Sequence, residues 1–257
     1  GARQLHQAMV KPIERLFDLP ANRNPVRLEA SAWPALVLLE IDLSQAALRQ
    51  GEELPRPQDL SQRSEGVLVE RLSIDGTGVR VHGSSLNLRV DAQQVRMDFA
   101  PDDAGGGWLV PADAADGTVR VQIGKADLQA LIESAARDAA DKQGVKVREV
   151  QLDLVPRGER SVGLDVRVVL SKLMMKATLR AGGQVDLDSQ LNARFSNMNC
   201  AGEGVVGSLL IPLVRPKIES LNGRSIALSA LPLGQARLRD IKIDVSDGLH
   251  VTAKLGR

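Results

Sequence analysis

The histidines and the single cysteine are the side chains best suited to catalysis or metal binding. His6 lies near the N-terminus, His82 lies beside a turn and His250 falls in the last predicted strand. A three-histidine metal site is possible in principle, but no short spacing supports it. Cys200 would need a neighbouring histidine or a positive helix end to become a reactive thiolate. One cysteine also excludes an intramolecular disulfide and a cysteine-based zinc site.

Glycine clusters are the second kind of candidate, because backbone amides in glycine-rich loops can bind phosphate. Gly105–Gly107 lacks the lysine, the serine and the flanking helix of a phosphate-binding loop. Gly202, Gly204 and Gly207 precede a predicted helix, whose N-terminus could bind an anionic headgroup. They could equally permit a tight turn from strand to helix. We therefore predict no catalytic residues, no metal and no cofactor, and we expect that the protein is not an enzyme.

Composition excludes several further classes of protein. Lys and Arg number 33 and Asp and Glu number 32, which argues against a nucleic-acid partner. Three Phe, two Trp and no Tyr give little surface for stacking bases or sugars. The sequence contains no run of 18 apolar residues, so we predict no membrane-spanning helix. The chain begins at Gly1 rather than Met, which we interpret as the remnant of a protease cut compatible with a signal peptide upstream.

The elements that would position a site differ between the two halves of the chain, which we expect to form one domain over residues 1–257. The N-terminal half is predicted to contain a helix over 3–19, strands over 26–30, 36–43 and 119–123, and polar loops over 44–66 and 100–118. Between the loops, apolar residues alternate with period two from Val67 to Phe99, interrupted by the turn signal Asp75-Gly76. This pattern predicts several short strands.

The C-terminal half, residues 124–257, reads as helix, meander, helix and hairpin. An apolar stripe that begins at Leu128 predicts an amphipathic helix ending near Gly144. Four strands are predicted over 145–154, 162–170, 173–179 and 185–195, followed by a small polar turn over 196–202. A nearly all-apolar helix is predicted over 204–221, and Asp247-Gly248 predicts a hairpin. The strands carry apolar residues on one face and charges on the other, so we predict an α+β fold. Its strongly curved antiparallel sheet would be wrapped around or packed on long helices.

Several short segments carry a resemblance to a known family. They are Leu231–Gly234, Arg237-Leu238, Ile241–Ile243 and Asp247–Val251 near the C-terminus, and Lys125–Leu131 earlier in the chain. These segments resemble the LmeA-like phospholipid-binding family, which is similar to tubular lipid-binding (TULIP) domains. The resemblance covers about 125–257 and extends only loosely over 26–123. It implies a TULIP-like fold, in which lipid tails lie between a curved sheet and a long helix, and non-catalytic lipid binding at or near a bacterial cell envelope.

Two classes of function remain open. The first is a lipid carrier or envelope-maintenance protein that binds a phospholipid or fatty acid in a hydrophobic cavity between sheet and helices. The second is a structural or protein-interaction domain with a fully packed core. The expected partners are a lipid or fatty acid and a membrane surface, with no nucleic acid, and the expected compartment is the periplasm or cell envelope, with the cytoplasm as the alternative. The predicted ligand-binding residues are Leu128, Leu131, Ile132, Ala135, Val166, Val168, Leu170, Met175, Leu179, Phe195, Val206, Leu209, Leu210 and Leu213.

Overall fold

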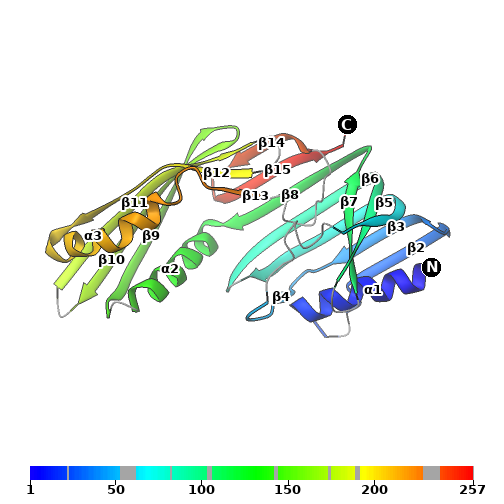
Figure 1. Ribbon diagram of the computed structural model, residues 1–257, viewed down its shortest axis with the longest axis horizontal. Coiled ribbons are helices and arrows are strands. Elements are labelled where there is room, and N and C mark those ends of the chain that lie inside the picture. Colours follow the sequence, from blue (N-terminus) through cyan, green and yellow to red (C-terminus); the bar gives the residue numbers. More distant parts are fainter. Residues whose placement is uncertain are drawn as a thin grey trace.

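The chain is mostly β, and its strands form two sheets that lie one after the other along the long axis of the molecule (Figure 1). The computed structural model describes residues 1–21, 23–52, 62–81, 83–102, 106–141, 144–172, 175–188, 192–227 and 238–256. Three helices of 15, 17 and 16 residues accompany the strands in these ranges. None of these helices is both long and apolar enough to cross a membrane.

The larger sheet has ten strands within the described part of the chain. They are β1 (Phe17–Asp18), β2 (Val26–Ala32), β3 (Ala35–Asp42), β4 (Ala47–Leu48), β5 (Ser64–Val81), β6 (Ser84–Pro101), β7 (Gly107–Asp113), β8 (Asp116–Gly124), β14 (Leu238–Asp244) and β15 (Gly248–Leu255). Their main order is β1-β4-β5-β6-β8-β15-β14, with β2, β3 and β7 joined beside it. Strands β3 and β4 run parallel to β5, and the other pairs are antiparallel. Helix α1 (Ala2–Leu16) buries Leu5, Met9, Ile13 and Leu16 in the main core.

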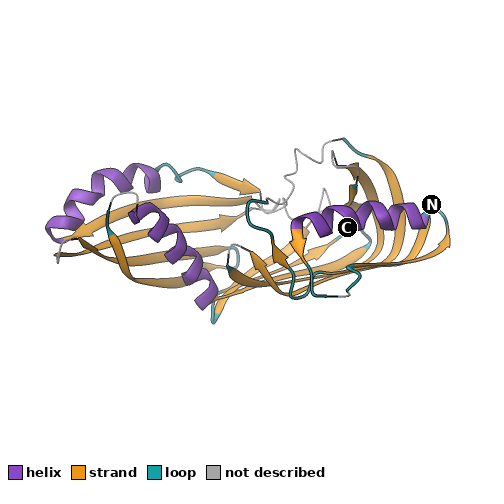
Figure 2. Cartoon of the chain, turned by 90° about the horizontal axis from the view of Figure 1, so that it is seen from below, coloured by secondary structure: helices purple, strands orange, loops and turns teal. Residues whose placement is uncertain are grey.

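The smaller sheet has five antiparallel strands in the order β13-β12-β11-β10-β9. They are β9 (Lys146–Gly158), β10 (Ser161–Lys172), β11 (Met175–Leu187), β12 (Asn192–Glu203) and β13 (Ser225–Ala227). Helix α2 (Lys125–Asp141) leads from β8 into this sheet and contacts β9, whereas α3 (Gly204–Glu219) follows β12 and contacts β11 and β12. Both helices therefore lie over the smaller sheet, at a distance from α1 (Figure 2).

Hydrogen bonds connect the larger sheet to helix α2, and apolar contacts connect it to the smaller sheet. The Ser84 hydroxyl donates to the Asp127 carbonyl at 3.0 Å, and the Ser85 N–H donates to the Asp127 carboxylate at 2.8 Å. These bonds attach the first turn of α2 to the β5–β6 hairpin. Leu187 and Ala193 of the smaller sheet are buried in the same cluster as the core of the larger sheet. The start of α2 and the part of the smaller sheet around Leu187 and Ala193 are thus anchored to the larger sheet.

The predicted fold class is wrong in its central feature. The molecule is mostly β, its longest described helix has 17 residues, and its sheets are not strongly curled, so the predicted α+β, TULIP-like arrangement of a curved sheet on long helices is not present. The main reason is that turn signals in the sequence do not end the strands in the structure. Asp75-Gly76 lies inside the 18-residue strand β5, where the irregularity is only a register shift between Gly76 and Val79. Asp75 accepts hydrogen bonds from the Thr77 N–H at 3.0 Å and the Thr77 hydroxyl at 2.8 Å, which satisfies the polar groups of this bulge locally.

Several predicted element bounds also change. The helices predicted over 3–19 and 204–221 are present as α1 and α3. The loop predicted over 100–118 is wrong, since it contains β7 and the start of β8. The strand predicted over 185–195 is wrong because β11 ends at Leu187 and β12 begins at Asn192. Strand β12 then continues through 196–202, so the turn predicted there is wrong. The loop predicted over 44–66 is wrong in its described part, which contains β4 and the start of β5, and its residues 53–61 lie outside the described residues.

Candidate functional site: an apolar cavity on the smaller sheet

An apolar cavity of about 390 Å³ lies between the smaller sheet and helices α2 and α3. Its volume falls in the range of about 300–1,000 Å³ that is usual for small-molecule sites. Lys217 is the one charged residue in its lining as described. The lining consists of Ile132, Ala136, Ala140, Val145, Leu164, Val166, Val168, Leu170, Leu179, Ala181, Gly182, Met198, Cys200, Val214, Lys217 and Ile218.

The floor of the cavity is the apolar face of β10, the strand between β9 and β11. Leu164, Val166 and Val168 follow one another at spacings of two, so their side chains share this face. All three are only half-buried, although the strand has hydrogen-bonded neighbours on both sides. Helix α2 contacts β9 and helix α3 contacts β11 and β12, so neither helix covers β10 fully. The aliphatic face of this strand is therefore where packing is incomplete.

Small residues in the walls keep the space open. Ala136 and Ala140 lie one turn apart on α2, and Ala181 faces the cavity from β11, where it pairs with Val166 of β10 and Cys200 of β12. Larger aliphatic residues at these three positions would extend into the cavity and fill part of it, as side chains fill the space in closely packed protein interiors. The cavity thus follows from the residue types of its walls as well as from the separation of the helices.

Glycines set the distance between α3 and the sheet. A Cβ atom on Gly202 would lie 2.6 Å from the carbonyl oxygen of Gly207, closer than real Cβ contacts allow. Gly204, at the first position of the helix, has a φ of 79°, a conformation that favours glycine. The glycine cluster that we considered for headgroup binding therefore has a structural reason, which is the close approach of α3 to β12.

The two ends of the cavity differ in exposure. At one end, Ala140, Val145, Leu170 and Leu179 belong to a buried cluster, and each is at most 9% exposed. At the other end, Leu164 and Met198 are half-buried and Lys217 is exposed.

Asn222 fixes the chain that follows α3 beside this second end. Its amide accepts from the Met198 N–H at 2.7 Å and donates to the Met198 carbonyl at 2.9 Å. The buried residues close the cavity at the first end, whereas the exposure of Leu164, Met198 and Lys217 leaves the second end open toward solvent.

The structure brings together part of the predicted ligand-binding set. Ile132, Val166, Val168, Leu170 and Leu179 line the cavity. Leu128 and Leu131 are half-buried on α2 and do not belong to the lining, and Phe195 lines a different, polar pocket. The side chains outside the described part of the structure are those of Ala135, Met175, Val206, Leu209, Leu210 and Leu213, and only their positions in α2, β11 and α3 are known.

Sequence reasoning missed lining residues on β12 and a charged lining residue on α3. Met198 and Cys200 were missed because 196–202 was predicted to be a turn, whereas both residues face the cavity from β12. Lys217 was missed because the helix predicted over 204–221 is characterised by its apolar residues alone. The signal that could have found Lys217 is its helical spacing from Val214, which places both on one face of α3.

The candidate catalytic residues are dispersed. His6 contacts the Val26 carbonyl at 2.9 Å in the larger sheet, and His250 lies 2.5 Å from Asp247 at the β14–β15 hairpin. His82 lies outside the described residues. Within the described part of the chain, no group of three or more His, Cys, Asp or Glu could hold a metal ion.

Cys200 sits in an environment that disfavours the thiolate. Burial raises the pKa of the Cys200 thiol, the positive charge of Arg215 opposes this and the negative charge of Glu219 adds to it. The side chain is 7% exposed and lines the cavity. A reactive thiol needs a depressed pKa, so the arrangement suits a small apolar lining residue better than a nucleophile.

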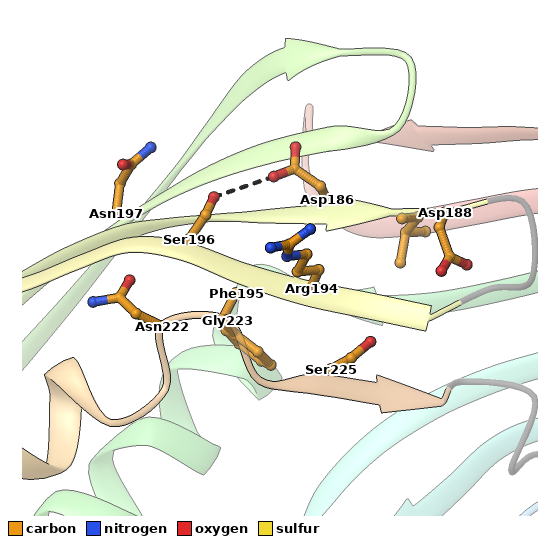
Figure 3. Close-up of a pocket in the computed structure, with 10 residues that line it drawn as sticks. Asp186, Asp188, Arg194, Phe195, Ser196, Asn197, Asn222, Gly223 and Ser225 are labelled. Carbon is orange, nitrogen blue, oxygen red and sulfur yellow. Dashed lines mark hydrogen bonds between the residues drawn. The ribbon is translucent and has the colours of Figure 1, made fainter.

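A second, polar pocket of about 600 Å³ lies among β11, β12 and the turn before β13 (Figure 3). Asp186 accepts hydrogen bonds there from the Ser161 hydroxyl, from the Gln184 amide at 2.7 Å and from the Ser196 hydroxyl at 3.2 Å. The Ser161 bond is the largest influence that holds the pKa of Asp186 below its ordinary value, against the raising effect of burial. The Asp186 carboxylate already accepts hydrogen bonds from groups of the protein. The apolar cavity is therefore a stronger candidate for a ligand site than this pocket.

Comparison of the chain with models of protein families, with curated proteins and with solved structures finds no match.

Proposed function

We propose that the protein binds an aliphatic ligand, a fatty acid or the acyl chain of a phospholipid, in the cavity on the smaller sheet, without catalysis. The observation that carries this proposal is the half-buried aliphatic face of β10, which borders a cavity of about 390 Å³. Burying apolar surface contributes about 25 cal/mol per Å², so an aliphatic chain gains affinity by covering this face. We propose the bacterial cell envelope or periplasm as its compartment on the basis of the sequence resemblance alone.

Two properties of the cavity favour an aliphatic ligand over a polar one. Its floor and walls are formed by branched aliphatic residues, alanine and glycine, which offer few hydrogen-bonding side chains. A polar ligand would lose its hydrogen bonds to water without replacement, which is unfavourable. Met198 and Cys200 add polarizable sulfur atoms, and the unbranched methionine side chain adapts to different chain shapes.

Val166 is the position that tests this function most sharply. It lies on the floor of the cavity, is half-buried and belongs to none of the buried clusters of the described residues. Val166→Trp should fill the space and weaken binding of Nile red, a neutral apolar dye, by at least about tenfold, equivalent to about 1.4 kcal/mol. Its melting temperature should fall by less than about 4 °C, since about 1 kcal/mol corresponds to 2–4 °C in a domain of this size.

Val169→Trp is the matched control. Val169 is another half-buried valine of β10, but strand alternation places it on the opposite face, beside Glu149 and Thr178. We expect it to leave dye binding within about twofold of the wild type, on a scale where tenfold is about 1.4 kcal/mol. Adding bulk to a filled core costs about 1–3 kcal/mol. A Val166→Trp variant that is destabilised to this extent, with unchanged dye binding, would instead identify a packed structural or protein-interaction domain.

A further inference from the structure

We infer that the ligand is an amphiphile with an anionic head, a carboxylate or a phosphate, which Lys217 binds at the open end of the cavity. This inference rests on the proposed function and adds the chemical class and the orientation of the ligand. Lys217 lines the otherwise uncharged cavity and has no ion pair with another described residue. An ammonium group at the edge of an apolar cavity can place its aliphatic stem against the lining and its charge in water.

Charged residues of α2 and α3 near Lys217 form ion pairs with one another, which leaves the Lys217 ammonium group available to bind a ligand. On α3, Arg215 and Glu219 form their own ion pair at 3.8 Å. On α2, Glu133 pairs with Arg137, and the residues that face the cavity are Ile132, Ala136 and Ala140. An anionic head would therefore meet an unneutralised positive charge at this end.

The topology places Lys217 at one end of the cavity and the most buried lining residues at the other. Helix α3 begins close to β11. A Cβ atom on Gly207 would lie 3.2 Å from the carbonyl oxygen of Thr178 in that strand. It ends where Asn222 is hydrogen-bonded to Met198. Strand register sets Leu170 beside Ala177 at the closed end and Leu164 beside Gly183 at the open end. These two residues of β10 are six positions apart, about 20 Å along a strand.

This polarity suits a ligand with one charged end. An aliphatic tail would lie along β10 from Leu164 toward Leu170, with its terminus among the buried residues Val145 and Leu179. The head would remain near solvent at Lys217, so its charge would not be taken into the apolar interior, where an isolated ion is strongly disfavoured. The opposite orientation would bury the charge and leave the tail in water.

Lys217→Gln provides the test, with dodecanoate, dodecyl phosphate and dodecanol as probes that share one tail. Binding is measured by displacement of Nile red from the full chain. Lys217→Gln should weaken dodecanoate or dodecyl phosphate about fivefold to tenfold, on the scale where tenfold equals about 1.4 kcal/mol. Dodecanol should bind both proteins with affinities within twofold, and the anion with the larger loss identifies the preferred head.

Lys176→Gln is the control, because Lys176 is an exposed lysine of β11 that does not line the cavity. It removes the same charge and should leave all three affinities unchanged. Equal affinities of wild type and Lys217→Gln for both anions would overturn the inference, while dodecanol binding would still support the proposed function. If none of the probes displaces Nile red from the wild type, both the inference and the proposed function fail.

Discussion

At the scale of single residues, the same side-chain types serve different ends according to the face on which they lie. Val166 and Val169 belong to one strand, yet only Val166 faces the cavity. Cys200 faces it as well and has a raised pKa because it is buried. The strand period of two could be predicted from the sequence, and with it Val166 and Val168. The position of Cys200 could not, because the small polar residues Ser196, Asn197 and Asn199 around it are typical of turns.

Asp186 provides a prediction at this scale, since its hydrogen bonds stabilise the charged carboxylate. A carboxyl whose folded-state pKa is depressed stabilises the protein above its unfolded-state value, 3.8, and loses this contribution as the pH falls through the lower folded-state pKa. Asp186→Asn should therefore lower the free energy of unfolding by about 1 kcal/mol at pH 7, a modest value because the group is half-exposed. Urea denaturation should show the difference shrinking as the pH falls below 3.8. A difference that is constant from pH 7 to pH 3 would contradict this account.

At the scale of elements, the separation of α3 from the sheet depends on the Gly202–Gly207 contact. Gly202→Ala would put a Cβ 2.6 Å from the Gly207 carbonyl oxygen, so the helix must shift. We expect a loss of about 1–3 kcal/mol in the free energy of unfolding, as for other overpacked contacts. Gly158→Ala is the control, because the nearest atom to its Cβ is 3.9 Å away, and it should change stability by less than about 0.5 kcal/mol. Similar denaturation midpoints for the two variants would show that the contact does not position α3.

The same scale explains which elements could be predicted. Helices α1 and α3 follow from local spacing of apolar residues, which the sequence displays directly. The length of β5 does not, because Asp75-Gly76 is compatible with either a hairpin turn or a bulge. The bulge prevails here because β6 pairs with β5 on both sides of it, from Ser64 to Val81. The full length of this pairing is not visible in the local sequence around Asp75-Gly76.

At the scale of the whole molecule, the cavity arises from an arrangement that no local pattern specifies. Helix α2 is attached to the larger sheet through Asp127 and Ser84, and α3 is held to β12 through glycines. Helix α2 therefore lies toward β9 and helix α3 toward β11 and β12, and the aliphatic face of β10 lies between them. The sequence could predict an apolar surplus over α2, β10 and α3. It could not predict that sheets that are not strongly curled would carry it.

Native mass spectrometry of the purified protein tests the central claim most directly. If the cavity binds an aliphatic ligand, protein produced in different hosts should carry an adduct with the mass of a fatty acid or phospholipid. The Val169→Trp variant should retain this adduct and the Val166→Trp variant should lack it, because Val166 borders the cavity and Val169 does not. Bare protein from every host, or an adduct that Val166→Trp retains to the same extent, would contradict the account.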